Sequence, residues 1–163
     1  MIRPACLGVT LLLAACAAAP AGPPPELAAP IECGADADWQ GPGPRVALYA
    51  SRSAFAAAYA ALHRNRRPAP RPPAVDFGRE AVAAVLLGMR PTAGYGLRLA
   101  DAFLEGEALV VVVVERRPPP GAITAQVITS PYCLVRLARG AWRTVRVQDP
   151  EGHRLGEAAL EGP

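Results

Sequence analysis

The sequence contains no lysine and few of the residues on which most catalytic sites depend. Its two histidines are His63 and His153, and its three serines are Ser51, Ser53 and Ser130. Without lysine, a phosphate-binding loop lacks the amine that reaches the phosphates. Ser130 lies between a threonine and a proline, which indicates a turn rather than a nucleophile elbow, and no His or Cys pair has the spacing of metal ligands. We therefore expect a chain that is not an enzyme, without catalytic residues, a metal site or a cofactor.

Charged residues are also few. Charged residues make up 19% of the chain, and the formal net charge is only +3. All 17 basic residues are arginine, and they form no long basic stripe. Because nucleic-acid binders need such a stripe to contact phosphates, nucleic acid is not expected as a partner. Aromatic residues contribute only 6%, whereas 19 prolines and 15 glycines predict a loop-rich body with short strands.

No apolar run reaches the ~20 residues that a membrane-spanning helix needs. The run Ala5–Ala15 follows a single positive charge and ends in small residues, which is typical of a secretory signal. Leu13-Ala14-Ala15-Cys16 resembles the lipobox of bacterial lipoproteins, in which the chain is cut before a cysteine that then carries lipid. Residues 1–15 are thus predicted to be a lipoprotein signal peptide and Cys16 the lipid attachment site. The alternative is an ordinary secretory cleavage site at Ala15-Cys16-Ala17.

Residues 16–30 are rich in proline and alanine and are predicted to form an extended tether. A protein that carries several acyl chains stays on its membrane, and this anchor is expected to be its only membrane contact. Because Ala17, and not an acidic residue, follows the cysteine, the outer membrane of the cell envelope is the favoured location.

Two further cysteines, Cys33 and Cys133, remain in the predicted mature protein, because Cys6 leaves with the signal and Cys16 takes the lipid. In an oxidising compartment such as the periplasm, these two thiols are expected to form a disulfide. Such a bridge closes a loop of about 100 residues, worth up to ~4.7 kcal/mol in the chain-entropy model. The alternative is two buried free thiols.

One early helix is predicted in the folded body. Phe55, Tyr59 and Leu62 recur at i, i+4 and i+7 and form one apolar stripe. Ser51 or Ser53 can cap the start of this helix. The arginine- and proline-rich connection that follows is expected to be solvated.

The rest of the body is predicted to be β-structure. Ala81–Leu87 is a continuous apolar run of the kind that is buried on both faces of a sheet, and five consecutive valines mark 108–115 as a central strand. Three prolines at 118–120 force the chain out of the sheet. The other predicted strands are 45–50, 97–103, 122–130, 132–139 and 142–148, the last two joined by a hairpin at Gly140.

These elements predict an α+β fold that is mostly β. Six or seven short antiparallel strands would form a curled sheet or a sandwich, and the one early helix would close one side. Residues 31–148 are expected to be a single globular domain. The tail 149–163 shows no pattern and is expected to be flexible.

Two motifs in a fixed order carry a resemblance to a known family. Residues 75–80 (VDFGRE) lead into an apolar strand, and residues 87–99 (LGMRPTAGYGLRL) follow it. After Pro120-Gly121 comes the stretch 128–139 (ITSPYCLVRLAR). This arrangement resembles the C-terminal domain of the protease complex subunit PrcB and its relatives, over roughly residues 75–139.

The chain departs from the family's motifs at two positions. Where the family has a Pro-Thr-Gly-Gly-Tyr turn, Ala93 replaces the first glycine. Where the family has a Thr-Ser-Pro-Tyr-His strand start, Cys133 stands in place of the histidine. The second departure favours a bonding partner for Cys133.

The resemblance implies a lipoprotein that associates with a surface protease and stabilises it, rather than a protease. We expect the two motifs to form one protein-binding surface for an envelope protease or another surface protein. Its predicted residues are Pro91, Thr92, Gly94, Tyr95, Thr129, Ser130, Pro131 and Tyr132. Proline and glycine allow a rigid loop that is not bulky, and a tyrosine offers contact area at low rotamer cost.

Other interpretations remain open on the sequence alone. The Tyr95 ring can instead pack into the core while its hydroxyl caps a neighbouring turn. The stretch RPTAGYGL is also similar to a loop of chagasin-type cysteine-protease inhibitors, although the other two loops of that pattern are not convincingly present. A structural envelope lipoprotein, or a domain that binds a small apolar ligand, is the third alternative.

Overall fold

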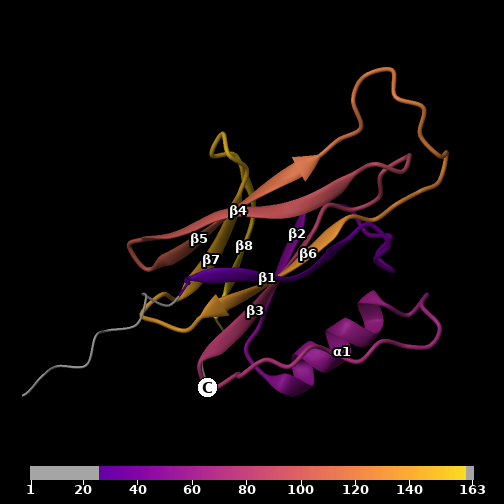
Figure 1. Cartoon of the computed structure of the whole chain (residues 1–163). Coiled ribbons are helices and arrows are strands. Elements are labelled where there is room, and N and C mark those ends of the chain that lie inside the picture. The colour runs from indigo at the N-terminus through magenta and orange to yellow at the C-terminus, as the bar shows by residue number, and fades with distance from the viewer. Residues whose placement is uncertain (1–25, 161–163) are drawn as a thin grey trace, which may run out of the picture.

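The computed structural model of the chain describes residues 26–160, which fold into two four-stranded sheets and one helix (Figure 1). The strand orders are β1-β6-β3-β2 in the first sheet and β4-β5-β7-β8 in the second. The mostly β fold with one early helix is thereby confirmed, as a sandwich of eight strands. In chain order the elements are β1 (Ala28–Gly34), β2 (Arg45–Tyr49), α1 (Arg52–Leu62), β3 (Glu80–Leu86), β4 (Gly96–Glu105), β5 (Ala108–Arg116), β6 (Tyr132–Ala138), β7 (Thr144–Gln148) and β8 (Arg154–Ala159).

Helix α1 begins where the sequence predicts it. Ser51 is the N-cap, and its hydroxyl accepts a hydrogen bond from the backbone N–H of Ala54 at 3.3 Å. The apolar stripe turns inward, so that Phe55 and Tyr59 are buried. They belong to a cluster with Leu134 on the outer face of the first sheet, which α1 therefore covers.

Strand β3 is buried on both faces, as its continuous apolar sequence predicts. Ala83 and Val85 belong to the core between the two sheets, whereas Val82 and Ala84 belong to the cluster under α1. The first sheet is thus the middle layer of three. Because β3 and β6 are its inner strands, both are sealed from water on each side.

The valine-rich strand β5 is central in the second sheet, as expected. It pairs with β4 through a hairpin at Gly106, whose φ of +58° is one that glycine adopts readily. On its other side β5 pairs with β7 in parallel, which differs from the all-antiparallel expectation.

The parallel pair arises because β6 and β7 lie in different sheets, so the hairpin predicted at Gly140 is wrong. Trp142 is only 2% exposed, and its indole N–H donates to the carbonyl of Ala138 at 2.9 Å. Burial of this ring in the core between the sheets accompanies the crossing of the chain from one sheet to the other.

Three other expectations about segments are corrected. Residues 122–130 form no strand, because the prolines direct the chain away from the sheets and leave its β-forming residues without a partner strand. The tail is ordered at 154–159, where β8 pairs with β7. Strand β1 starts at Ala28, inside the predicted tether, because it pairs with β6 along its whole length.

The disulfide between Cys33 and Cys133 is confirmed. The two residues lie directly opposite each other in the antiparallel β1–β6 ladder, with their Cα atoms 4.0 Å apart. The predicted signal peptide 1–15, the lipid attachment site Cys16 and most of the tether lie outside the described residues. Within residues 26–160 no helix combines the length and apolar character of a membrane span.

Candidate functional site

The two motif segments lie side by side in the structure. Arg90 and Thr129 exchange both backbone hydrogen bonds, at 2.7 Å from Arg90 N–H and 2.9 Å from Thr129 N–H. The Thr129 hydroxyl also donates to the carbonyl of Thr92 at 3.0 Å. These bonds fasten the turn that contains residues 91–95 to the β5–β6 loop, which we define as residues 117–131.

Five of the eight predicted binding residues reach the surface. Pro91 and Gly94 are exposed, and Thr92, Tyr95 and Thr129 are half-buried. Tyr95 therefore does not disappear into the core, which was the alternative that the sequence left open.

The other three predicted binding residues, Ser130, Pro131 and Tyr132, are buried and do not present a surface to a partner. The Ser130 hydroxyl donates to the carbonyl of Trp39 at 2.9 Å, which satisfies the only hydroxyl that the sequence offered as a nucleophile. Tyr132 is 0% exposed and packs under α1. These residues fix the base of the β5–β6 loop.

An ion pair between Arg90 and Glu115 lies next to the turn at 91–95. The Arg90 guanidinium lies 3.0 Å from the carboxylate of Glu115, and its centre is 6.0 Å from the middle of the Tyr95 ring. Burial opposes ionisation of Glu115, but hydrogen bonds from Arg117 and Arg90 outweigh it, so the pKa of Glu115 is below its ordinary value. Gly94 has a φ of +96°, which other residues adopt rarely.

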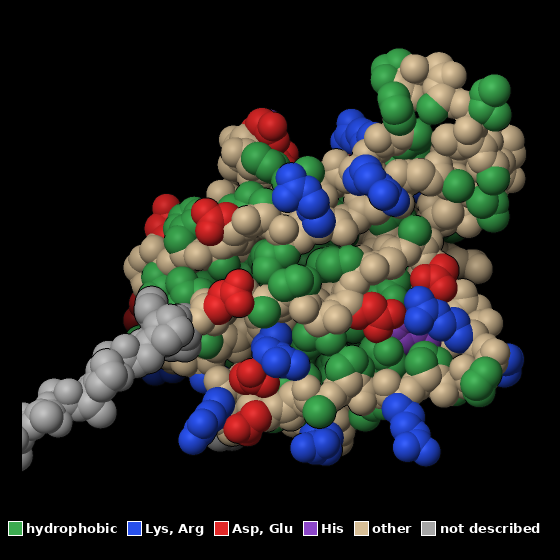
Figure 2. Space-filling view, in the orientation of Figure 1, with side chains coloured by type: hydrophobic (Ala, Val, Ile, Leu, Met, Phe, Trp, Pro, Cys, Tyr) green, Lys and Arg blue, Asp and Glu red, His purple; other side chains and the backbone are tan. Residues whose placement is uncertain are grey.

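Large apolar side chains gather on and beside the β5–β6 loop, which projects from the sandwich (Figures 1 and 2). Met89 is 50% exposed, Val127 51%, Ile128 69% and Ile123 fully exposed. We call these four residues the apolar loop surface. Sequence reasoning missed Ile123, Val127 and Ile128 because it assigned 122–130 to a strand, where alternate side chains would be buried. Exposed apolar groups of this size are typical of interaction sites.

A groove of about 540 Å³ opens beside the apolar loop surface. Met89, Val127 and Ile128 line it together with Trp39 and the acidic side chain of Asp36. Polar and apolar residues line the groove in about equal numbers, and protein interfaces likewise combine an apolar core with a polar rim.

A partly buried polar cluster joins β1, β6, α1 and the segment that follows α1, and the sequence analysis did not predict it. The Glu32 carboxylate accepts hydrogen bonds from the hydroxyls of Tyr132 at 2.5 Å and Tyr59 at 2.9 Å. It also accepts one from Arg66 at 3.2 Å, while the ring nitrogen Nε2 of His63 is 3.6 Å away. No local pattern marks the cluster, because its residues come from three separate parts of the chain: Glu32, the stretch from Tyr59 to Arg66, and Tyr132.

The electrostatics of the cluster favour one ionised carboxylate and neutral rings. Burial opposes ionisation of Glu32, but hydrogen bonds from Tyr132, Tyr59 and Arg66 keep its pKa below the ordinary value. Burial, together with the bond to Glu32, raises the pKa of Tyr59 to about 12, and it raises the pKa of Tyr132 as well. Burial lowers the pKa of His63. Tyrosines that hold their protons this firmly suit a structural brace better than proton transfer at neutral pH.

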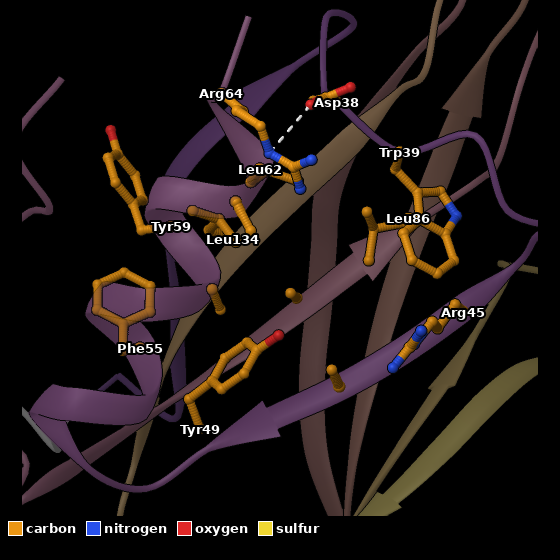
Figure 3. A pocket seen from close by; sticks show the side chains of 14 residues that line it. Asp38, Trp39, Arg45, Tyr49, Phe55, Tyr59, Leu62, Arg64, Leu86 and Leu134 are labelled. Atoms are coloured by element: carbon orange, nitrogen blue, oxygen red, sulfur yellow. Dashed lines mark ion pairs between the residues drawn. The ribbon is translucent and has the colours of Figure 1, made fainter. Parts of the chain in front are cut away.

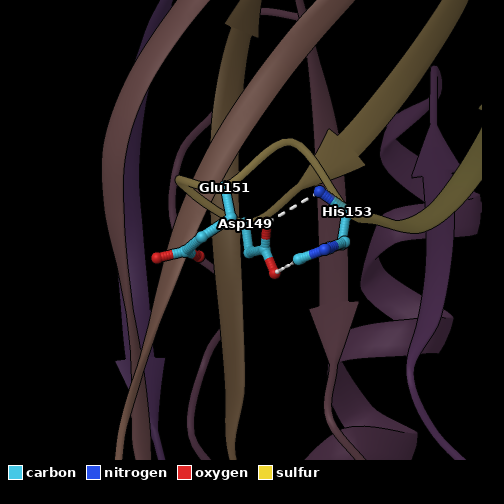
Figure 4. Close-up of side chains that lie close together, drawn as sticks. All are labelled: Asp149, Glu151 and His153. Atoms are coloured by element: carbon cyan, nitrogen blue, oxygen red, sulfur yellow. Dashed lines mark hydrogen bonds and ion pairs between the residues drawn. The ribbon is translucent and has the colours of Figure 1, made fainter.

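The three side chains of Asp149, Glu151 and His153 come together at the β7–β8 turn (Figure 4). Their potential metal-binding atoms lie within 4.8 Å of one another. However, Asp149 already accepts from the backbone N–H of His153 at 2.8 Å and pairs with its ring at 2.9 Å, and the Glu151 carboxylate points away. Closure of the turn accounts for this arrangement, and we assign no metal to it.

Comparison with known protein families gives one result that bears on the motifs. A family model described as PrcB C-terminal matches residues 81–138. The match confirms the resemblance found in the sequence, and it covers the turn at 91–95, the β5–β6 loop and all of β6. Searches of curated proteins and of solved structures find no match.

Proposed function

We propose that this chain is a non-catalytic protein-binding module that associates with a protease, or another protein of the cell envelope, and stabilises it. The observation that carries the proposal is the apolar loop surface, whose four large apolar side chains are each at least half exposed. The match of residues 81–138 supports a protease complex as the setting, because the resemblance implies a protease-associated subunit.

Exposure of this apolar surface to water costs free energy, and a partner that covers the surface would remove that cost. Apolar area gains about 25 cal/mol per Å² when it leaves water. The surface is also held in place before binding, because Arg90–Thr129 backbone bonds and the Ala93 to Ala125 bond of 3.0 Å fix the loop. A pre-ordered surface loses less entropy on association. The hydroxyls of half-buried Thr92 and Tyr95 would form the polar rim, next to exposed Pro91.

The proposal includes a lipid anchor at Cys16, which would hold the module at the membrane where its partner lies. It is supported by the sequence Leu13-Ala14-Ala15-Cys16 alone. Replacement Cys16→Ala is expected to release the protein from the membrane fraction and to remove the mass of the lipid. An unchanged mass and unchanged extraction would overturn the anchor and leave the binding role untouched.

Photo-crosslinking in native membranes tests the binding role. A photo-reactive amino acid placed at Ile128 is expected to give a crosslinked product of defined mass. The matched control is the same group at Leu104, which is 55% exposed on β4 near the β4–β5 hairpin, at the other end of β5. Equal products from both positions would contradict a specific surface.

The identity of the crosslinked protein separates the two functions that the sequence suggested. If it is a protease, a stabilising subunit is expected to prolong its active lifetime without lowering its turnover. An inhibitor would lower turnover on addition of the purified chain.

A further inference from the structure

A second site is a cavity of about 200 Å³ between α1 and the outer face of the first sheet, which shares Asp38 and Trp39 with the groove beside the apolar loop surface (Figure 3). Phe55, Tyr59 and Leu62 of α1 line it, and Leu86 and Leu134 of the sheet lie across from them. Its walls are mostly apolar, and it is not filled by any side chain of the described residues.

The cavity exists because the residues that should fill it are alanines. Ala58 and Ala61 face it from α1, and Ala47 and Ala84 face it from β2 and β3. The short side chains of these four alanines leave the space between the helix and the sheet unfilled. Unfilled apolar space of this size is costly to a small domain, which suggests that it is occupied in use.

The mouth of the cavity carries a cation without an anionic partner among the described residues. The Arg45 guanidinium lies 4.8 Å above the centre of the Trp39 ring and makes no ion pair or side-chain hydrogen bond within residues 26–160. The other charges at the mouth, Arg64 and Asp38, are 3.5 Å apart and neutralise each other. The mouth therefore has a net positive charge that complements an anion.

A hydrogen-bond donor also faces the space. Figure 3 shows the Tyr49 hydroxyl directed toward the middle of the cavity, between the α1 side and the Trp39 side. Burial raises the pKa of Tyr49, so this hydroxyl keeps its proton at neutral pH.

We propose that this cavity binds a small carboxylate that carries one aromatic ring or one branched aliphatic group. An apolar cavity of about 150 Å³ is large enough to bind benzene, so 200 Å³ holds one ring but not a lipid acyl chain. The ring would lie among Phe55, Leu86 and Leu134, and the carboxylate would meet Arg45 and the Tyr49 hydroxyl. This site does not depend on the proposed role of the apolar loop surface.

The test uses the full chain and 3-phenylpropanoate as the probe. Trp39 is in the wall of the cavity, whereas Trp142 is buried in the other core, so a saturable change in tryptophan fluorescence is expected on binding. The methyl NMR signals of Leu86 and Leu134 are expected to shift with the same affinity. The absence of any saturable change, or shifts that spare both leucines, would overturn the proposal.

Matched variants locate the probe. Ala58→Leu fills the cavity and is expected to abolish binding, whereas Ala57→Leu, at an exposed position of the same helix, should bind as the wild type does. Ala61→Leu serves the same purpose if Ala58→Leu unfolds. Unaltered binding in a folded cavity-filled variant would overturn the site.

The charge of the mouth is tested separately. Arg45→Gln is expected to weaken 3-phenylpropanoate by about tenfold, since a hydrogen bond to a charged group is lost. The neutral 3-phenylpropanamide should bind the wild type and Arg45→Gln equally, and propanoate, which lacks the ring, should not bind. Equal affinity for acid and amide in the wild type would overturn the carboxylate assignment.

Discussion

The Tyr132 hydroxyl donates a 2.5 Å hydrogen bond to Glu32, which lies 100 positions earlier in the chain. The next residue of each strand, Cys33 and Cys133, forms the disulfide. Tyr132 belongs to the cluster on the α1 side of the sheet and Cys133 to the core between the sheets. Strand β1 is therefore tied to β6 on both faces, at the point where the β5–β6 loop ends.

The first prediction concerns the hydrogen bond itself. Tyr132→Phe removes a donor to a carboxylate and leaves Glu32 with one bond fewer, so the free energy of unfolding should fall by about 1–3 kcal/mol. Urea denaturation measures this loss in the free energy of unfolding. Tyr95→Phe is the control, because the Tyr95 hydroxyl has no hydrogen bond within the described residues, and it should change stability by less than about 0.5 kcal/mol. Equal losses in the two variants would contradict the structural role of Tyr132.

The second prediction concerns pH. Burial lowers the pKa of His63 below its ordinary 6.5, so below pH 6.5 the unfolded chain binds a proton that the folded chain resists. Stability should therefore fall as the pH drops through this range. Because the pKa of Glu32 is lowered from 4.5, its contribution is lost only under more acidic conditions.

The corresponding measurement compares the wild type with His63→Gln. The free energy of unfolding is measured at about pH 7.5 and about pH 5.5, which lie on either side of the unperturbed histidine pKa. The wild type should lose more stability than His63→Gln between the two. Equal losses would show that His63 does not resist protonation in the folded state.

The third prediction concerns the disulfide. Replacement of both Cys33 and Cys133 by alanine should lower the free energy of unfolding by about 2–5 kcal/mol, because the bridge closes a long loop in the unfolded chain. The wild type in reducing agent should show a similar loss. Alkylation without reduction should leave both thiols unlabelled, and labelling of either in the folded oxidised protein would contradict the bridge.

The fourth prediction concerns β8, which the sequence pattern does not reveal. A Cβ atom at Gly156 would lie 2.7 Å from Cγ2 of Val46, so Gly156→Ala forces β8 and β2 apart. Such overpacking should cost about 1–3 kcal/mol. Gly140→Ala is the control, since its Cβ would make only ordinary contact with Trp142 at 3.4 Å. A neutral Gly156→Ala would indicate that the tail does not pack on the first sheet.

Elements with a strong period were predictable from the sequence. The stripe Phe55, Tyr59 and Leu62 identified α1. Ser51 or Ser53 was the predicted cap, and the structure shows that it is Ser51. The continuous apolar run of β3 identified a strand buried on both faces, because a strand with one face in water would alternate polar and apolar residues. Strand β8 escaped notice because Gly156 and Glu157 interrupt its short apolar pattern, and only pairing with β7 reveals it.

The segment 122–130 was predicted to be a strand but forms a loop, whereas β8 is a strand that was not predicted. Its isoleucines, valine and threonines favour a strand, but propensity acts only where a partner strand is available. The prolines before it remove that partner, and Ile123, Val127 and Ile128 become part of the exposed apolar loop surface. The motif segments were correctly identified, whereas the burial of Tyr132 could not be read from its neighbours.

The Glu32 cluster could not be predicted as a cluster, although the helical stripe had placed Tyr59 on the apolar face of α1. Glu32, Tyr59, His63, Arg66 and Tyr132 are brought together only by the pairing of β1 with β6 and by the packing of α1. Neither relationship has a local signature in the sequence. The cavity under α1 is similar, since an alanine on a helix does not show whether a larger residue fills the space across from it.

The apolar loop surface is proposed to bind a protein partner. The most direct measurement is the affinity of the partner, once isolated by crosslinking from position 128, for three forms of the full chain. The double variant Val127→Asp/Ile128→Glu is predicted to bind at least about 100-fold more weakly than the wild type, as expected for loss of central apolar contacts. Leu104→Glu should bind as the wild type does. Undiminished binding by the folded double variant would contradict the account.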